Sequence, residues 1–182
     1  EVFFDGIYKP VRKLGYVNTV IDVGATTGEF SLWVSNQANN IYAIEGHTKV
    51  FPYLKENVSD FENIKVFNLA LGDKGRMGHM TTGTTEGIDG GSALSEDETP
   101  TEYDIPVKTL ASFMEENEIG IVDCLKIDIE NDEKQVFEAP DFVEVSGNIK
   151  MIIGEHVPPM SGELLKSLGF RETRGKVWYY KR

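Results

Sequence analysis

The segment from residue 19 to residue 45 restricts the fold of this chain more strongly than any other. It reads TVIDVGATTGEFSLWVSNQANNIYAIE, which contains an apolar β-branched run, a turn with glycines, a helical stretch and a second apolar run. Runs of valine and isoleucine fit strands that are buried on both faces, as the strands of parallel sheets are. The segment therefore predicts a strand, a turn, a helix and a second strand of an α/β domain.

The turn after the first strand carries the pattern Gly-x-x-x-Gly. Gly24 ends the strand, and Thr26 and Thr27 are candidate N-caps of a helix that extends to about Ala38. Gly28 falls in the first turn of this helix, where glycine costs about 1 kcal/mol relative to alanine. We interpret this cost as a sign that a ligand approaches the backbone closely at Gly28.

Two acids frame this turn. Asp22 lies inside the first apolar run, where a carboxylate needs hydrogen bonds, so we expect it to orient the turn or the ammonium group of a ligand. Glu45 follows the turn by about twenty residues, a spacing that suits an acid that binds a ribose diol. Because Thr26 replaces the second glycine of the dinucleotide pattern, a ligand without a pyrophosphate fits better, and S-adenosylmethionine is the common one. A dinucleotide enzyme of the NAD type and a turn without a ligand are the alternatives.

Polar residues also end the later predicted strands. In the strand predicted over 122–129, Lys126, Asp128 and Glu130 share one face by two-residue alternation. Glu155 and His156 follow the apolar run 149–153. Neighbouring carboxylates often have displaced pKa values and belong to functional sites. The alternative is a structural trio in which Lys126 satisfies the acids.

The blocks VIDVGATTGEFSLW, YAIE, FNLALGD and LKIDIENDE, in this order and spacing, resemble the FkbM family of S-adenosylmethionine-dependent methyltransferases. The resemblance extends from about residue 17 to about residue 170. It implies a class I methyltransferase fold: a mainly parallel seven-stranded sheet with an antiparallel C-terminal hairpin and helices on both faces. It also implies transfer to an oxygen. The chain departs from the family at Thr26 and Thr27, where the family usually has Asn-Ile, and at residues 131–133, where it usually has Gly-Ala-Glu.

The motifs and the resemblance together assign the site. The predicted cofactor-binding residues are Asp22, Gly24, Ala25, Gly28, Glu45, Asn68, Ala70, Leu71, Ser92 and Asp128. The predicted catalytic residues are Asp128, Glu130, Glu155 and His156, with His156 as the general base. We assign no metal. The competing hypothesis is a divalent cation bound by Asp128, Glu155 and His156.

Composition limits the partners. The 182 residues suit a single domain, with residues 1–16 as a lead-in, and the net charge of −12 would repel phosphate backbones. We therefore expect a small-molecule or carbohydrate acceptor and no nucleic acid. We find no membrane-spanning run and no signal pattern, so we expect a soluble, cytoplasmic protein. The chain begins at Glu1 rather than at a methionine, which is compatible with a piece of a longer protein. The sequence predicts no oligomeric state.

An acidic stretch lies in the middle of the chain. Between Arg76 and Lys108 there is no lysine or arginine, whereas acids and glycines accumulate. Long loops of this kind are often lids. We expect residues 83–102 to form a loop that closes over the cleft, and the alternative is a solvated loop without a role. A module that binds S-adenosylmethionine without catalysis is the alternative for the whole chain.

Overall fold

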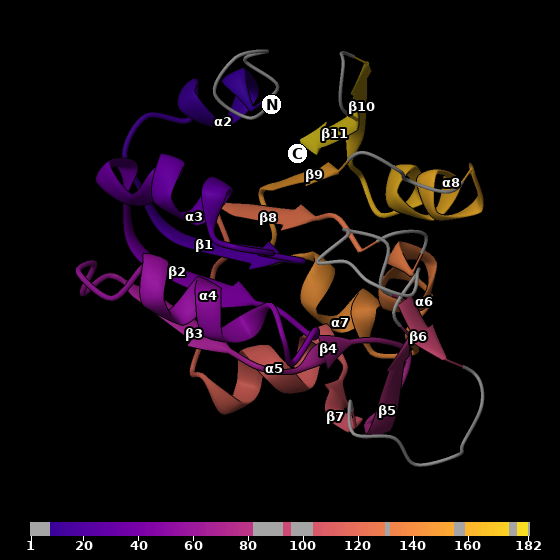
Figure 1. Cartoon of the computed structure of the whole chain (residues 1–182). Coiled ribbons are helices and arrows are strands. Elements are labelled where there is room, and N and C mark those ends of the chain that lie inside the picture. The colour runs from indigo at the N-terminus through magenta and orange to yellow at the C-terminus, as the bar shows by residue number, and fades with distance from the viewer. Residues whose placement is uncertain are drawn as a thin grey trace.

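A seven-stranded sheet forms the centre of the computed structural model, which describes residues 8–81, 93–95, 104–129, 132–154, 159–174 and 178–181 (Figure 1). The strand order is β10-β11-β9-β8-β1-β2-β3. The strands are β1 Val17–Val23, β2 Ala38–Ile44, β3 Ile64–Phe67, β8 Cys124–Ile127, β9 Met151–Gly154, β10 Arg171–Arg174 and β11 Trp178–Lys181. The five strands from β9 to β3 are mutually parallel, and β11 is antiparallel to both of its neighbours. The predicted sheet with an antiparallel C-terminal hairpin is confirmed.

Helices cover both faces of this sheet. The helices are α2 Lys9–Arg12, α3 Glu29–Val34, α4 Phe51–Asn57, α5 Leu110–Glu116, α6 Glu133–Phe137, α7 Phe142–Ser146 and α8 Pro159–Ser167. Helices α2, α3 and α4 pack on one face in a core that includes Val20, and α5 to α8 pack on the other in a core that includes Ile21. Adjacent residues of one strand thus point into different cores, as pleating requires. Cys124 is buried, as an inert core thiol would be.

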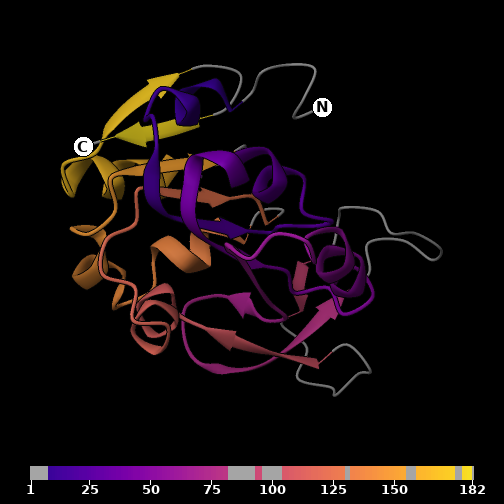
Figure 2. The ribbon, with the colours of Figure 1, turned by 90° about the vertical axis from the view of Figure 1, so that its left-hand side faces the viewer.

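A small second sheet lies at the end of the molecule opposite the C-terminal hairpin (Figure 2). It contains β4 Ala70–Leu71, β7 Asp104–Lys108, β5 Arg76–Thr81 and β6 Ala93–Ser95, in that order. Strand β6 pairs antiparallel with β5. The prediction of a long loop is therefore wrong at residues 93–95, because backbone pairing with a distant strand gives this segment structure that its composition does not suggest. The rest of the predicted lid, residues 83–92 and 96–102, lies outside the described residues.

Helix α3, which follows the glycine turn, is shorter than its sequence predicts. Helix α3 begins at Glu29, with Gly28 as its N-cap and no side-chain capping bond, so the assignment of Thr26 and Thr27 as caps is wrong. A one-turn 3-10 helix, Ser35–Gln37, then follows, and Ala38 already belongs to β2. The late start of α3 follows from local backbone geometry, since Thr26 and Gly28 both have positive φ and cannot belong to a right-handed helix.

Within the described residues, no helix has the length and apolar character that a membrane span requires.

Candidate functional site

The glycine turn lies at the carboxyl end of β1, beside the ends of β2 and β8. Its left-handed residues are Gly24 (φ 72°), Thr26 (φ 53°) and Gly28 (φ 99°). The amides of Gly24 and Ala25 both donate to the carbonyl of Ile44, at 3.0 and 2.9 Å. These bonds hold the turn against the end of β2. The predicted residues Gly24, Ala25 and Gly28 therefore form one rigid feature at the carboxyl edge of the sheet, where open α/β sheets bind ligands.

The chain itself makes the close approaches that the glycines allow. A Cβ atom at Gly24 would lie 1.9 Å from the backbone oxygen of Asp128, and one at Gly28 would lie 3.0 Å from the Leu54 side chain. We interpreted the glycine at position 28 as a sign that a ligand approaches the backbone. That interpretation is wrong for the direction in which a Cβ atom would point, because side chains of the protein lie there. That side is filled by α4, whose Leu54 packs over the turn.

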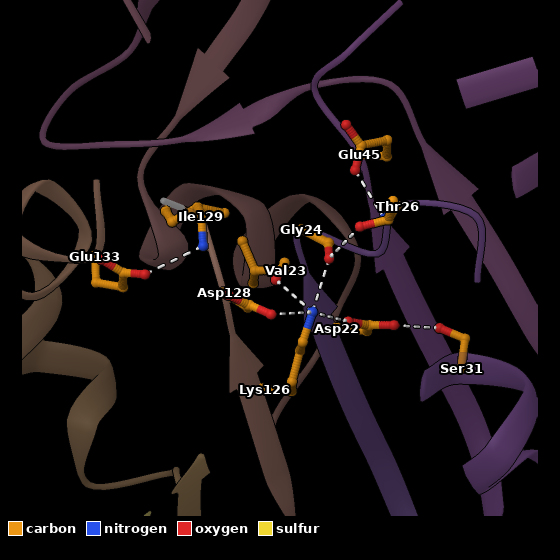
Figure 3. Close-up of polar contacts among 10 residues, drawn as sticks. All are labelled: Asp22, Val23, Gly24, Thr26, Ser31, Glu45, Lys126, Asp128, Ile129 and Glu133. Carbon is orange, nitrogen blue, oxygen red and sulfur yellow. Dashed lines mark hydrogen bonds and ion pairs between the residues drawn. The ribbon is translucent and has the colours of Figure 1, made fainter. Parts of the chain in front are cut away.

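A buried ion pair lies beneath the turn (Figure 3). The ammonium of Lys126 is 3.2 Å from Oδ1 of Asp22, and both side chains are at most 5% exposed. The second oxygen of Asp22 accepts from the Ser31 hydroxyl of α3 at 2.7 Å. One oxygen of Asp22 thus lies beside the Lys126 ammonium, and the other accepts from Ser31. The role of Asp22 in orienting the turn or the ammonium group of a ligand stays a prediction.

Lys126 also contacts the turn backbone and a second acid. Its ammonium donates to the carbonyl of Gly24 at 2.7 Å and to that of Val23 at 3.4 Å. The carboxylate of Asp128 lies 3.8 Å away and its side chain is 32% exposed. Burial lowers the pKa of Lys126, but the negative charges of Asp22 and Asp128 outweigh burial and raise it overall. The amine therefore stays protonated at neutral pH. The structural trio expected as an alternative is present in part, with Asp22 as the closer acid.

Glu45 follows the end of β2 and joins two turns. Its Oε2 accepts from the amide of Thr26 at 2.8 Å, and its Oε1 accepts from the amide of His47 at 2.7 Å. The residue is 8% exposed. Burial raises the pKa of Glu45, and the two amide bonds and the charge of Lys126 offset this only in part. Ionisation of Glu45 is thus less favourable than that of an exposed glutamate, and two hydrogen bonds hold its carboxylate beside the turn.

The end of β3 completes this rim. Asn68 follows β3 directly, and its side-chain amide donates to the carbonyls of Glu45 at 2.8 Å and Gly46 at 3.3 Å. Strand β4, which consists of Ala70 and Leu71, begins two residues after Asn68. The prediction that residues 68–71 reach the same edge as Gly24 and Glu45 is confirmed for Asn68, which bonds to the Glu45 backbone.

Four predicted site residues, Ser92, Glu130, Glu155 and His156, lie outside the described residues. The structure therefore gives no geometry for the predicted general base or for the competing metal site. Among the residues that the structure does describe, no three His, Cys, Asp or Glu side chains form a group suited to a metal ion.

Three contributors were missed from the sequence. These are Ser31, which bonds to Asp22, Thr26, whose amide bonds to Glu45, and Lys126 as the support of the turn. The helical stretch offers one signal in retrospect, because Ser31 lies between two apolar residues of α3 and is fully buried. No local pattern indicates that Lys126 bonds to Gly24, because Lys126 lies on β8, 102 residues further along the chain.

Solved structures share this fold at low sequence identity. Precorrin-6y C5,15-methyltransferase from Geobacter metallireducens is 12% identical, with a TM-score of 0.56 over 97% of this chain and 86% of that one. TrmK of M. capricolum, in complex with S-adenosylhomocysteine, is 13% identical, with a TM-score of 0.53 over 94% of this chain and 64% of that one. An rRNA methylase from Streptococcus thermophilus is 9% identical, with a TM-score of 0.51 over 92% and 88%. The chain thus has the fold of S-adenosylmethionine-dependent methyltransferases.

No curated protein sequence matches the chain. The family model described as the methyltransferase FkbM domain matches residues 22–173, which include the glycine turn, Glu45 and Asp128. This match extends over most of the 182 residues. The chain therefore belongs to the FkbM family of methyltransferases.

Proposed function

We propose that this protein binds S-adenosylmethionine at the carboxyl ends of β1, β2 and β3 and transfers its methyl group to an oxygen of a small molecule or sugar. The observation that carries the proposal is the Glu45 carboxylate, fixed beside the glycine turn by the amides of Thr26 and His47. A carboxylate has about four acceptor positions, and two are used here. The other two suit the two hydroxyls of a ribose.

The residues around Glu45 fit the rest of this cofactor. The turn at Gly24 is proposed to hold the methionine moiety, and residues 68–71 are proposed to line the adenine. Asp128, a partly exposed acid beside the turn, suits a cationic group. When bound, the cofactor supplies an electrophilic methyl group. The protein must then hold the acceptor oxygen in line with that methyl, since positioning supplies much of the barrier reduction.

An alcohol acceptor must also lose a proton. We assign this step to His156, oriented by Glu155, with Asp128 and Glu130 placing the acceptor. His156→Gln should abolish most methylation and leave cofactor affinity unchanged. Full activity of this variant would remove His156 from the mechanism. Activity that excess chelator abolishes and magnesium restores would instead support a cation held by Asp128, Glu155 and His156.

Charge supports a small acceptor rather than a nucleic acid. The net charge is −12, and residues 77–107 contain no lysine or arginine. A chain of this charge repels a phosphate backbone, because binding to nucleic acid relies on basic side chains. An acceptor panel of sugars, phenols and carboxylic acids, assayed for methyl transfer alongside RNA, tests this choice. Methylation of RNA alone would contradict it.

The binding proposal is tested by titration calorimetry with S-adenosylhomocysteine. Glu45→Ala should weaken binding by about 1.5–3 kcal/mol, the scale for hydrogen bonds to a charged group. Glu45→Gln, which keeps the shape of the side chain, guards against a folding defect in the alanine variant. Glu29→Ala is the matched control, because Glu29 is an exposed acid of the same segment. Unchanged affinity in both Glu45 variants would contradict the assignment.

A further inference from the structure

Lys126 lies under the glycine turn and has no assigned role in the proposed chemistry. Its described neighbours offer four acceptors: Gly24 O at 2.7 Å, Asp22 Oδ1 at 3.2 Å, Val23 O at 3.4 Å and Asp128 Oδ2 at 3.8 Å. A protonated amine has only three N–H donors. The acceptors of the protein itself therefore saturate the ammonium, so Lys126 acts on a ligand only through its neighbours.

Two of those neighbours belong to the segments proposed to hold the methionine moiety, the turn at Gly24 and the residue after β8. The Gly24 carbonyl belongs to the left-handed turn and also accepts the Thr26 hydroxyl at 3.4 Å. Asp128 is tied to β1 by its amide, which donates to Val23 at 3.1 Å. Lys126 thus links the last residues of β1 to the first residue after β8, and it sets the separation between a carbonyl and a carboxylate.

The local charge favours an entering cation. Among the described residues, two carboxylates, of Asp22 at 3.2 Å and Asp128 at 3.8 Å, lie beside the one ammonium of Lys126. Asp22 and Glu45 are buried, whereas the side chain of Asp128 is 32% exposed. A ligand cation can therefore reach Asp128 from solvent. The raised pKa of Lys126, caused by Asp22 and Asp128 against the opposing effect of burial, excludes the amine as a proton acceptor at neutral pH.

We infer that Lys126 is a positioning residue, which fixes the turn through the Gly24 carbonyl and holds the Asp128 carboxylate where that carboxylate receives the ammonium group of the ligand's methionine moiety. This inference rests on the proposed function, because it assigns Lys126 to the same cofactor. It predicts that loss of Lys126 weakens binding of the amino-acid part of the ligand and leaves binding of the nucleoside part unchanged. A lysine with a purely structural role would not show this selectivity.

Two ligands separate these parts. S-adenosylhomocysteine contains both, whereas 5′-methylthioadenosine keeps the adenosine and the thioether but lacks the ammonium and carboxylate. Titration calorimetry with Lys126→Met should show about tenfold or greater loss of affinity for S-adenosylhomocysteine. Affinity for 5′-methylthioadenosine should stay within about twofold of the wild-type value. Equal losses for both ligands, or no loss for either, would overturn the inference.

Further variants separate positioning from stability. Asp22→Asn/Lys126→Met removes both buried charges, which should restore much of the stability lost in the single variant. Its preference for S-adenosylhomocysteine over 5′-methylthioadenosine should stay as low as in Lys126→Met, and recovery of the preference would overturn the inference. Asp128→Asn changes a partly exposed side chain and keeps the fold. It should also lower the preference, and an unchanged preference would count equally against the inference.

The matched control is Lys150→Met, which breaks a lysine–aspartate pair at the other end of the sheet, where Lys150 lies 2.6 Å from Asp123. Both affinities should match the wild type. A selective loss of S-adenosylhomocysteine binding in this control would overturn the inference, because the effect would not depend on the turn. If the wild-type protein binds neither ligand, the proposed function itself fails, and that result differs from every outcome above.

Discussion

The acids at the two ends of the central sheet have different partners. At the amino end, the Asp123 carboxylate accepts from the amides of Asn18 at 2.8 Å and Thr19 at 3.0 Å, and from Lys150 at 2.6 Å. One acid faces one lysine there, and two amides complete its bonding. At the carboxyl end, in the part of the chain that the structure describes, the buried Lys126 lies between two acids, Asp22 at 3.2 Å and Asp128 at 3.8 Å.

The pKa directions at the two ends follow these surroundings. Burial raises the pKa of Asp123, but Lys150 and the two amides outweigh burial and lower it overall. At Glu45 burial dominates and the pKa is raised. The carboxyl end also contains Thr26, a β-branched residue with φ 53°. Glu118, in the loop before β8, also has a positive φ of 55°, so backbone strain alone does not separate the two ends. Unfavourable ionisation of a buried acid is frequent at functional sites, which supports the binding role proposed for the carboxyl end.

The largest effect is expected from Gly24→Ala. The new Cβ would lie 1.9 Å from the backbone of Asp128, at a residue with φ 72°. Overpacking and the left-handed conformation together should cost about 4 kcal/mol, a large fraction of the roughly 5–15 kcal/mol by which domains are stable. Gly147→Ala is the control, since φ is −61° and no atom lies within 4 Å of the new Cβ. Urea unfolding of both variants measures the difference. A wild-type midpoint for Gly24→Ala would show that the strand ends move apart readily.

Lysine removal should distinguish the two ends by stability alone. Lys126→Met leaves Asp22 buried without its cation and should lower the free energy of unfolding by about 3 kcal/mol. Lys150→Met breaks a pair whose lysine side chain is 62% exposed, and such pairs contribute at most about 1 kcal/mol. Thermal and urea unfolding give both values. Equal losses would contradict the distinction between the buried Lys126–Asp22 pair and the partly exposed Lys150–Asp123 pair.

Strain relief at the turn should be smaller and stabilising. Asparagine adopts left-handed backbone conformations more readily than threonine, so Thr26→Asn should raise the free energy of unfolding by about 1 kcal/mol. Thr27→Asn is the matched control, because Thr27 has no positive φ. Urea midpoints at an unchanged slope measure the effect. A destabilised Thr26→Asn variant would show that the weak hydroxyl bond to Gly24 matters more than the strain.

The smallest effect is a difference in pH dependence. The stabilisation from Asp123 is present above its ordinary pKa of 3.8 and is lost as pH falls through the lowered folded-state value. Glu45 behaves oppositely: its contribution is present below its ordinary pKa of 4.5 and is lost as pH rises through the raised folded-state value.

Unfolding free energies measured between about pH 3 and pH 7 should therefore diverge for two variants of matched shape. The deficit of Asp123→Asn relative to the wild type should grow with rising pH, and that of Glu45→Gln should shrink. Parallel curves for the two variants would remove the electrostatic distinction between the ends of the sheet.

The sequence by itself determined the parallel sheet, the glycine turn and the acid at the end of β2. These features follow from local patterns: apolar runs predict buried strands, and parallel topology brings their carboxyl ends to one edge. Asp22 and Glu45 were therefore identified without any tertiary contact. The resemblance to the FkbM family, confirmed over residues 22–173, rests on the same blocks.

Only the tertiary structure decided how the site is supported. The bond from Lys126 to Gly24 spans 102 residues, and that from Thr26 to Glu45 spans 19. Such contacts depend on strand register and on a left-handed turn at a threonine, neither of which a local pattern specifies. The small sheet depends in the same way on pairing between β5 and β6. Backbone pairing and charge burial are set by the atoms that meet in space, so the role of Lys126 became visible only where β1 and β8 lie side by side.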